Sequence, residues 1–181
     1  MGIAERDLYF DWAVQYYAVG RFAVFAGVNP IAGTLLHHAV EIALKAYLLG
    51  KLSPDQVKTG FDHSLPRLWE AFKESSSRDL RSHDAVVARL HQFETIRYPD
   101  HVALHGMQAT LNVAAPGAAG KARRRLPAPS PRYDVNLPEI DTLLDDIFEE
   151  ASVNPKFFVQ KLIRKEAREY LSRENVTRFA G

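Results

Sequence analysis

Two histidines, a glutamate and a lysine occur together in the otherwise apolar segment Leu35–Leu49. His37 and Lys45 each lie four residues from Glu41, and His38 lies three residues before it, so in a helix all four share one face. Glutamate before lysine at this spacing is the favourable order for an ion pair. Burying such groups costs free energy unless they are paired or used. We therefore predict a polar groove here, which is either a functional site or an ion pair that orients two helices.

The same side chains could also bind a metal ion. A histidine and a glutamate four residues apart, here His37 and Glu41, can meet one ion, with the distant His63 as a third ligand. The sequence gives no firm third ligand, so we expect no metal and no cofactor. The chain has no cysteine, which excludes disulfides, thiolate metal sites and cysteine nucleophiles. Motifs for phosphate-cradling glycine loops, serine hydrolases, zinc proteases and calcium loops are also absent.

Length and composition indicate one soluble globular domain. The chain has 181 residues, of which 46% are apolar and 25% charged, with a net charge of +1. This balance demands neither nucleic acid nor an anionic membrane as a partner. The N-terminal residues lack the layout of a secretory signal, and no apolar run reaches the roughly 18 residues that a membrane span needs. We expect a cytoplasmic protein that does not contact membranes.

Apolar spacings and helix-boundary residues predict an all-α fold, a bundle of four or five core helices within a single domain, 1–181. The second helix is apolar around most of its circumference and should be central; Asn29 is its expected N-cap. Ser53 and Gln56 form a capping box before a short helix. The expected helices cover residues 7–27, 30–49, 54–60, 64–75, 79–97, 137–151 and 154–172.

Residues 102–136 differ from the rest and predict a long irregular insertion. Its middle is dominated by Ala, Pro, Gly and Arg, and segments 110–113 and 132–135 could form a short β-hairpin at its base. A basic cluster in this insertion could contact phosphates, although it lacks interleaved aromatic residues; the alternative is a solvated loop. The cluster consists of Lys121, Arg123, Arg124 and Arg125. A basic helical tail, 154–181, follows an acidic helix that we expect to neighbour a basic segment.

Two segments together resemble the HEPN superfamily of small helical domains. In that family, a helix containing E-x-x-L-K precedes a G-H-x-L-x-x-L segment at the start of a later helix. Glu41-Ile42-Ala43-Leu44-Lys45 matches the first pattern, and Asp62-His63-Ser64-Leu65-Pro66-Arg67-Leu68 matches the second, with aspartate where glycine is usual. The likeness covers approximately residues 7–100 and 137–151.

The resemblance implies a four- or five-helix bundle that often dimerises. Many members are metal-independent ribonucleases, and others bind nucleotides or act as non-catalytic partner modules. In catalytic members an arginine is followed, after four to six residues, by a histidine at the end of a late helix. The histidine handles protons while the arginine stabilises the pentavalent phosphate during attack by the ribose 2′-hydroxyl. Here Arg97 is followed by His101 after three residues and by His105 after seven, and Pro99 interrupts the helix between them.

Two functions follow as expectations. The first is a non-catalytic HEPN-like module that binds RNA, a nucleotide or a protein partner, in a stress or toxin–antitoxin setting as the resemblance implies. The second is a ribonuclease with an atypical pair, Arg97/His101 or Arg97/His105. The structural alternative places Arg97 against an acid such as Glu41, with both histidines solvated. A homodimer is also expected, because the half-apolar first helix and the polar groove suit a symmetric interface.

Overall fold

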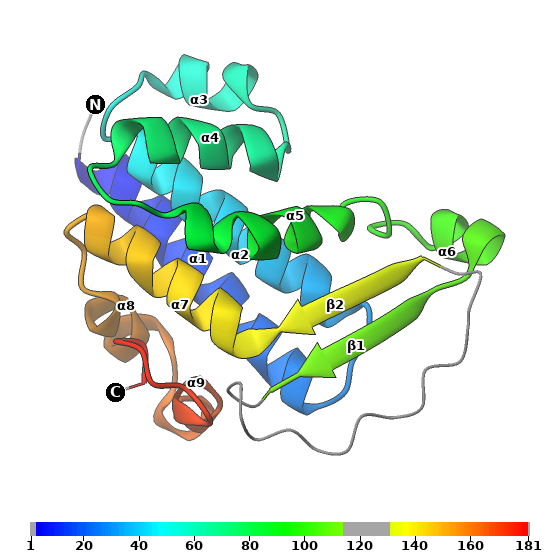
Figure 1. Cartoon of the computed structure of the whole chain (residues 1–181). Coiled ribbons are helices and arrows are strands. Elements are labelled where there is room, and N and C mark those ends of the chain that lie inside the picture. The colour runs from blue at the N-terminus through cyan, green and yellow to red at the C-terminus, as the bar shows by residue number, and fades with distance from the viewer. Residues whose placement is uncertain (1–2, 114–130, 181) are drawn as a thin grey trace.

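The computed structural model describes residues 3–113 and 131–180 and shows a helical bundle with two short strands at one end (Figure 1). Within these residues the predicted mainly helical fold is confirmed. The first half contains α1 (Ile3–Phe25), α2 (Ile31–Leu48), α3 (Pro54–Gly60), α4 (Leu65–Ser75), a 3₁₀ turn (Arg81–His83), α5 (Asp84–Gln92) and α6 (Pro99–His105). The second half contains α7 (Leu137–Glu150), α8 (Pro155–Leu162), a 3₁₀ turn (Lys165–Ala167) and α9 (Glu169–Ser172).

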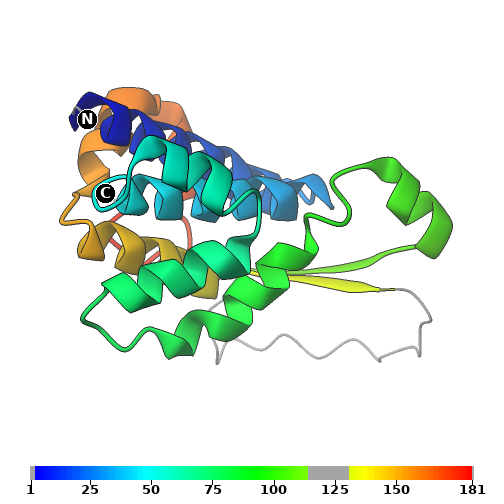
Figure 2. The same ribbon diagram turned by 90° about the horizontal axis from the view of Figure 1, so that it is seen from above.

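Helix α2 is the centre of the bundle, as its apolar circumference predicts. Helix α1 packs along it, and α4, α5 and α7 also contact it. Figures 1 and 2 show α7 and α4 on different sides of α2. Most α2 side chains are buried, including Leu36, Val40 and Leu44, which have no exposed surface. A polar side chain on this helix therefore has to find its partner inside the protein or at the edge of the bundle.

At Gly33 the side chain of Phe93 packs closely against the backbone of α2. A Cβ atom built at Gly33 would lie 2.0 Å from Cε1 of Phe93, whose ring is buried. Gly33→Ala is therefore expected to lower the free energy of unfolding by about 1–3 kcal/mol, because the ring has to move in a packed core. Chemical denaturation measures this. The control is Gly60→Ala, whose Cβ meets nothing within 4 Å and which should leave stability nearly unchanged. Equal stabilities of the two variants would contradict the expectation.

Two predicted helix starts have different outcomes. The Ser53–Gln56 capping box is confirmed: the Gln56 N–H donates to Ser53 Oγ at 3.3 Å, and the Ser53 N–H donates to Gln56 Oε1 at 2.9 Å. The prediction that Asn29 caps α2 is wrong. The Asn29 N–H bonds the carbonyl of Gly27 at 3.1 Å, so the residue belongs to the turn after α1, and Pro30 is the N-cap.

The predicted helix 79–97 is shorter in the structure, where α5 ends at Gln92. Residues 93–97 continue as successive turns in which each N–H bonds the carbonyl three residues earlier. The Thr95 hydroxyl donates to the Gln92 carbonyl at 2.7 Å and thereby competes for a helical acceptor. Phe93 and Ile96 in these turns are buried, whereas Arg97 lies in a turn rather than on a helix.

The two strands are located close to their predicted positions, but the predicted hairpin is wrong. Strands β1 (Gln108–Asn112) and β2 (Arg132–Asn136) pair in parallel, with Gln108 opposite Arg132 and Asn112 opposite Asn136. Parallel pairing requires a long connection, which the residues between the strands provide. Tyr133 and Val135 of β2 face the core, and β2 leads directly into α7.

The tail is interrupted where a single helix was predicted. Ile163 and Arg164 adopt extended backbone between α8 and the following 3₁₀ turn. The Arg168 side chain donates to the carbonyls of Gln160 and Ile163 at 2.7 and 2.8 Å. These bonds satisfy carbonyls at the end of α8 that would otherwise continue the helix, so the chain turns back on itself.

Candidate functional site

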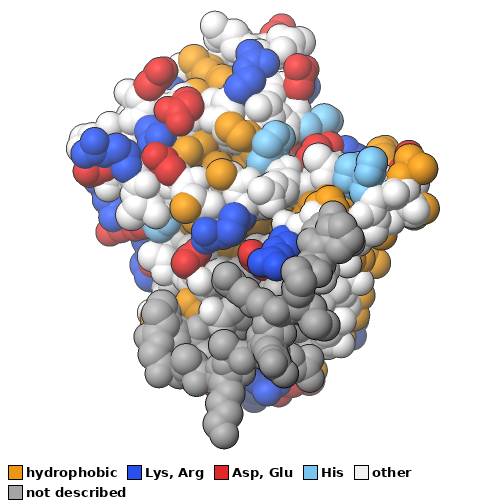
Figure 3. Space-filling view, turned by 45° about the vertical axis from the view of Figure 1, so that its right-hand side comes forward, with side chains coloured by type: hydrophobic (Ala, Val, Ile, Leu, Met, Phe, Trp, Pro, Cys, Tyr) orange, Lys and Arg blue, Asp and Glu red, His pale blue; other side chains and the backbone are white. Residues whose placement is uncertain are grey.

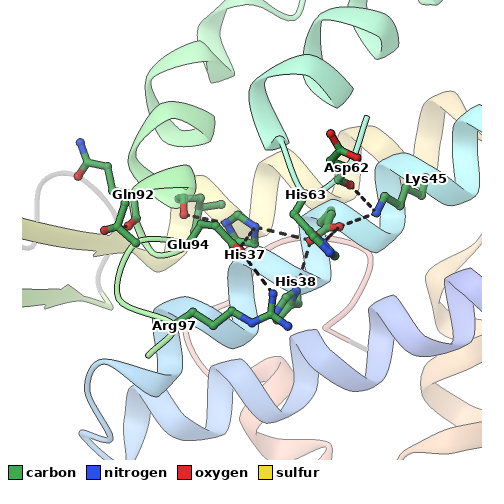
Figure 4. A network of polar contacts seen from close by, with 11 residues as sticks. His37, His38, Lys45, Asp62, His63, Gln92, Glu94 and Arg97 are labelled. Atoms are coloured by element: carbon green, nitrogen blue, oxygen red, sulfur yellow. Dashed lines mark hydrogen bonds and ion pairs between the residues drawn. The ribbon is translucent and has the colours of Figure 1, made fainter. Parts of the chain in front are cut away.

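The carboxylate of Glu41 is buried on α2 and is surrounded by basic side chains. Figure 4 labels these neighbours, which are His37, His38, Lys45 and His63. Lys45 Nζ and His63 Nδ1 donate to Glu41 Oε1 at 2.6 and 3.1 Å, and His38 Nδ1 donates to Oε2 at 3.3 Å. His37 Nε2 lies 3.6 Å from Oε2. Three of these partners, His37, His38 and Lys45, lie on the same face of α2 as Glu41, as their spacing in the sequence predicts. The polar groove therefore exists as a connected cluster, and His63 joins it from a different element.

Hydrogen bonding keeps Glu41 ionised although it is buried. Burial alone would raise the pKa of this carboxyl, but the adjacent imidazoles of His37 and His38, together with the hydrogen bond and the charge of Lys45, outweigh that effect. The result is a pKa well below the usual range for glutamate. Glu41 is consequently a fixed negative charge at the floor of the groove.

The loop before α4 is attached to this cluster by two contacts. Lys45 Nζ donates to the backbone carbonyl of Asp62 at 3.1 Å, and His63 bonds Glu41 as described above. The His63 side chain keeps 59% of its surface exposed. The two segments that carry the family resemblance, although separated in sequence, therefore meet at one site, with His63 at its open rim.

A cavity of about 470 Å³ opens beside the cluster, between α1, α2 and the α3–α4 region. Its apolar wall combines aromatic and aliphatic side chains from three helices: Leu8, Tyr9, Trp12, Ile42 and Val57. Its polar side comprises His38, Glu41, Lys45, Lys58, Asp62 and His63. Trp12 is 53% exposed although it is large and apolar. An exposed tryptophan next to buried charges is typical of a ligand-binding surface rather than of a packed core.

His37 is buried more deeply than the other histidines of the cluster. Its Nδ1 bonds the backbone carbonyl of Leu90 at 3.0 Å, and its Nε2 is buried without a hydrogen-bond partner. Two carboxylates face that nitrogen, those of Glu41 and of Glu94, each at 3.6 Å. Glu94 lies in the turns after α5, and sequence spacing gave no indication that it approaches α2.

Arg97 joins the edge of the same network. Its Nη1 lies 3.4 Å from Glu94 Oε1, and its side chain extends toward His38 in Figure 4. It pairs with Glu94 rather than with Glu41 and remains about one-third exposed. The rings of His101 and His105 on α6 have centroids 4.7 Å apart and are tilted by 47°. Helix α6 projects away from the main helices of the bundle (Figures 1 and 2). Across the described residues, Arg97 forms no hydrogen bond, ion pair or ring contact with either histidine.

The acidic helix α7 neighbours arginines from several parts of the chain. Arg78 bonds Asp146 and Glu149 at 2.8 Å each, and Arg178 bonds Asp145 at 2.8 Å. On the face seen in Figure 3, acidic and basic side chains are intermixed, and histidines lie near hydrophobic side chains. The acidic side chains of α7 therefore largely form ion pairs with arginines of the same chain.

A buried ion pair between α1 and α7 was missed in the sequence. Arg21 and Asp141 form this pair, and the Tyr17 hydroxyl donates to Asp141 at 2.6 Å. The sequence contained an indication of this burial: Arg21 lies four residues after Tyr17, and Asp141 lies four after Leu137, so each charged residue falls on a buried face.

The basic cluster predicted to contact phosphates, Lys121, Arg123, Arg124 and Arg125, lies outside the described residues.

No helix in the described ranges has the length and apolar character to cross a membrane. Comparison with models of known protein families, with curated proteins and with solved structures found no match to this chain.

Proposed function

We propose that this chain is a HEPN-like binding module that holds a nucleotide, free or at the end of an RNA, in the cavity beside Glu41. The make-up of that cavity carries the proposal: an exposed tryptophan and aliphatic side chains form its apolar part, and two lysines, two histidines and the acids Glu41 and Asp62 form its polar part. Its volume of about 470 Å³ lies within the range of small-molecule sites, roughly 300–1,000 Å³.

Each part of a nucleotide has a suitable partner in this cavity. A base can stack on the exposed Trp12 ring, which tolerates any base because every base has a π-face. The exposed Asp62 side chain can accept hydrogen bonds from ribose hydroxyls, as acidic residues do in other nucleotide sites. Lys58 and His63 at the open rim can donate to phosphate oxygens. Lys45 offsets the charge of Glu41, so the buried carboxylate repels a phosphate less.

The conformation of Asp62 supports the HEPN-like part of the proposal. Asp62 has a φ of +47°, in the left-handed region that glycine adopts most easily and that aspartate tolerates. This is the position where the family usually has glycine. The departure from the family pattern therefore has a structural explanation: the backbone conformation that glycine would favour is kept.

Isothermal titration calorimetry with adenosine, AMP, ATP and a short single-stranded RNA tests the proposal. We expect binding of AMP or ATP, weaker binding of adenosine, and RNA binding only if a terminal nucleotide reaches the cavity. Trp12→Ala should weaken binding about 5- to 150-fold, the equivalent of about 1–3 kcal/mol of stacking. Lys58→Ala should weaken the phosphorylated ligands about tenfold and leave adenosine unaffected.

Matched controls come from exposed residues outside the cavity. Phe157→Ala removes another exposed aromatic ring, and Lys165→Ala removes another exposed lysine. Both should bind nucleotides like the parent protein. Absence of nucleotide binding by the parent at millimolar concentration, or equal losses in cavity and control variants, would contradict the proposal.

One observation favours a second candidate function, a metal-independent ribonuclease. The Arg97 side chain is about one-third exposed and extends toward the histidine cluster (Figure 4). Incubation with mixed-sequence RNA in EDTA tests it, alongside Arg97→Ala and the double variant His101→Ala/His105→Ala. Cleavage that Arg97→Ala abolishes would support an enzyme, and the double variant would show whether the α6 histidines take part. Absence of cleavage by the parent would rule this function out.

A further inference from the structure

The strongest unexplained feature is Nε2 of His37, which is buried without a hydrogen-bond partner. Its imidazole is 1% exposed, and Nδ1 uses its proton to bond the Leu90 carbonyl at 3.0 Å. The other nitrogen, Nε2, has no hydrogen-bond partner, yet carboxylate oxygens of Glu41 and Glu94 face it at 3.6 Å each. The lone pair of Nε2 directed between two anionic carboxylates is electrostatically unfavourable, so a cation bound between these three groups would be stabilised.

The spacing of the surrounding atoms fits a tetrahedral metal ion. Bonds of about 2.0–2.1 Å from zinc to nitrogen or oxygen place tetrahedral ligand atoms about 3.3 Å apart. Glu41 Oε2 lies 3.3 Å from His38 Nδ1 and 3.6 Å from His37 Nε2. Ligand atoms of these three residues all lie within 4.8 Å of one another. Small side-chain rotations would therefore complete the coordination.

We propose that His37 Nε2, His38 Nδ1 and Glu41 Oε2 bind a divalent transition-metal ion, with zinc as the best fit, and that Glu94 or water supplies the fourth ligand. In this state His38 is the tautomer with its proton on Nε2, so that Nδ1 offers its lone pair to the ion in place of its hydrogen bond to Glu41. Two imidazoles and a carboxylate are a ligand set that suits zinc and similar ions rather than Mg²⁺ or Ca²⁺. The sequence predicts no metal, because the distant His63 is not a firm third ligand. In the structure His63 bonds the other oxygen of Glu41, and His38 and Glu94 are the additional candidates.

Contacts behind the ligands also fit a metal site. The Leu90 carbonyl fixes the His37 tautomer so that Nε2 is the nitrogen that faces the site. Lys45 and His63 bond Glu41 Oε1 and leave Oε2 directed toward the two histidines. Such outer bonds orient ligands in known metal sites, and their loss typically weakens metal binding about 10- to 100-fold.

The test is zinc binding to chelator-treated protein, without nucleotide, by calorimetry, with visible absorption of bound Co²⁺ as a report on coordination geometry. The surface pair His101 and His105, four residues apart on α6, could bind zinc independently. The measurements are therefore made in the background His101→Asn/His105→Asn. We expect one equivalent of zinc, the Co²⁺ spectrum of a four-coordinate site, and no response to Mg²⁺.

His38→Asn in the same background should weaken zinc binding at least tenfold; its side chain is 19% exposed, so the fold should tolerate the change. Trp12→Ala is the matched control and should bind zinc normally, which separates this proposal from the nucleotide proposal. Loss of all zinc binding in the α6 double variant would assign the metal to the surface pair. Unaltered zinc binding by His38→Asn would place the ion at another site, and no binding by the parent would leave a proton as the cation between the carboxylates; either result would overturn the inference.

Discussion

Replacement of Arg21 by methionine is expected to lower the free energy of unfolding by about 3–5 kcal/mol, because it leaves a buried carboxylate without its partner. The Arg21 guanidinium is fully buried and bonds Asp141 together with the backbone carbonyls of Tyr170, at 2.8 Å, and Arg173. It therefore joins α1 to α7 and to the C-terminal segment. Guanidinium chloride unfolding followed by circular dichroism measures the loss.

The other members of this network explain why the loss should be large. Burial raises the pKa of Asp141 and the Arg21 guanidinium opposes that rise, so removing Arg21 favours the protonated acid. Tyr17 donates to Asp141, and Asn175 Nδ2 donates to the Tyr17 hydroxyl at 3.0 Å. These bonds depend on the position of the carboxylate and would be disturbed with it.

Two further variants test whether the loss of stability in Arg21→Met comes from the buried ion pair. The control is Arg81→Met, whose ion pair with Asp79 is exposed on both sides and should hardly affect stability. The double variant Arg21→Met/Asp141→Leu should recover much of the loss, since it leaves no unpaired charge in the core. If Arg21→Met were as stable as Arg81→Met, the assigned role of the buried pair would be wrong.

The second large effect is expected at Glu41. Glu41→Gln should lower the free energy of unfolding at neutral pH by about 3 kcal/mol, because Lys45 and the neighbouring histidines lose the carboxylate that all of them contact. The control Glu70→Gln removes an exposed partner of Lys73 and should have little effect.

The sign of the pH dependence follows from the lowered pKa of Glu41. A carboxyl with a lower pKa in the folded state stabilises the fold fully above its unfolded pKa, about 4.3, and loses this contribution as the pH falls toward the folded pKa. The advantage of the parent over Glu41→Gln should therefore shrink below about pH 4.3. Denaturation curves collected across this range measure it, and a difference that stays constant with pH would contradict the assignment.

The parts of the site that sequence could predict are those governed by local spacing. His37, His38, Glu41 and Lys45 share one face of a helix because the helical period dictates it. The apolar circumference of the second helix also predicted its central position correctly. Both predictions depend only on the helical periodicity of side chains within one helix.

The contacts that sequence could not predict join distant segments. Glu94 reaches His37 only because the chain leaves α5 at Gln92 in a series of tight turns, a change that the apolar pattern does not encode. Arg21 and Asp141 each carried a burial signal, but nothing in either segment indicated the other as its partner. The parallel pairing of β1 and β2 depends on the path of a long connection, whereas the sequence pattern suggested the shorter route of a hairpin.

The central claim, that a nucleotide base occupies the cavity against Trp12, is tested most directly by the fluorescence of that residue. The chain has two tryptophans, and Trp69 is buried, so in a Trp69→Phe variant Trp12 is the remaining reporter. Titration of this variant with AMP or ATP should quench the emission saturably, and Lys58→Ala should shift the midpoint to higher concentration. Emission that stays unchanged at millimolar nucleotide, in a variant whose circular dichroism matches the parent, would contradict the account.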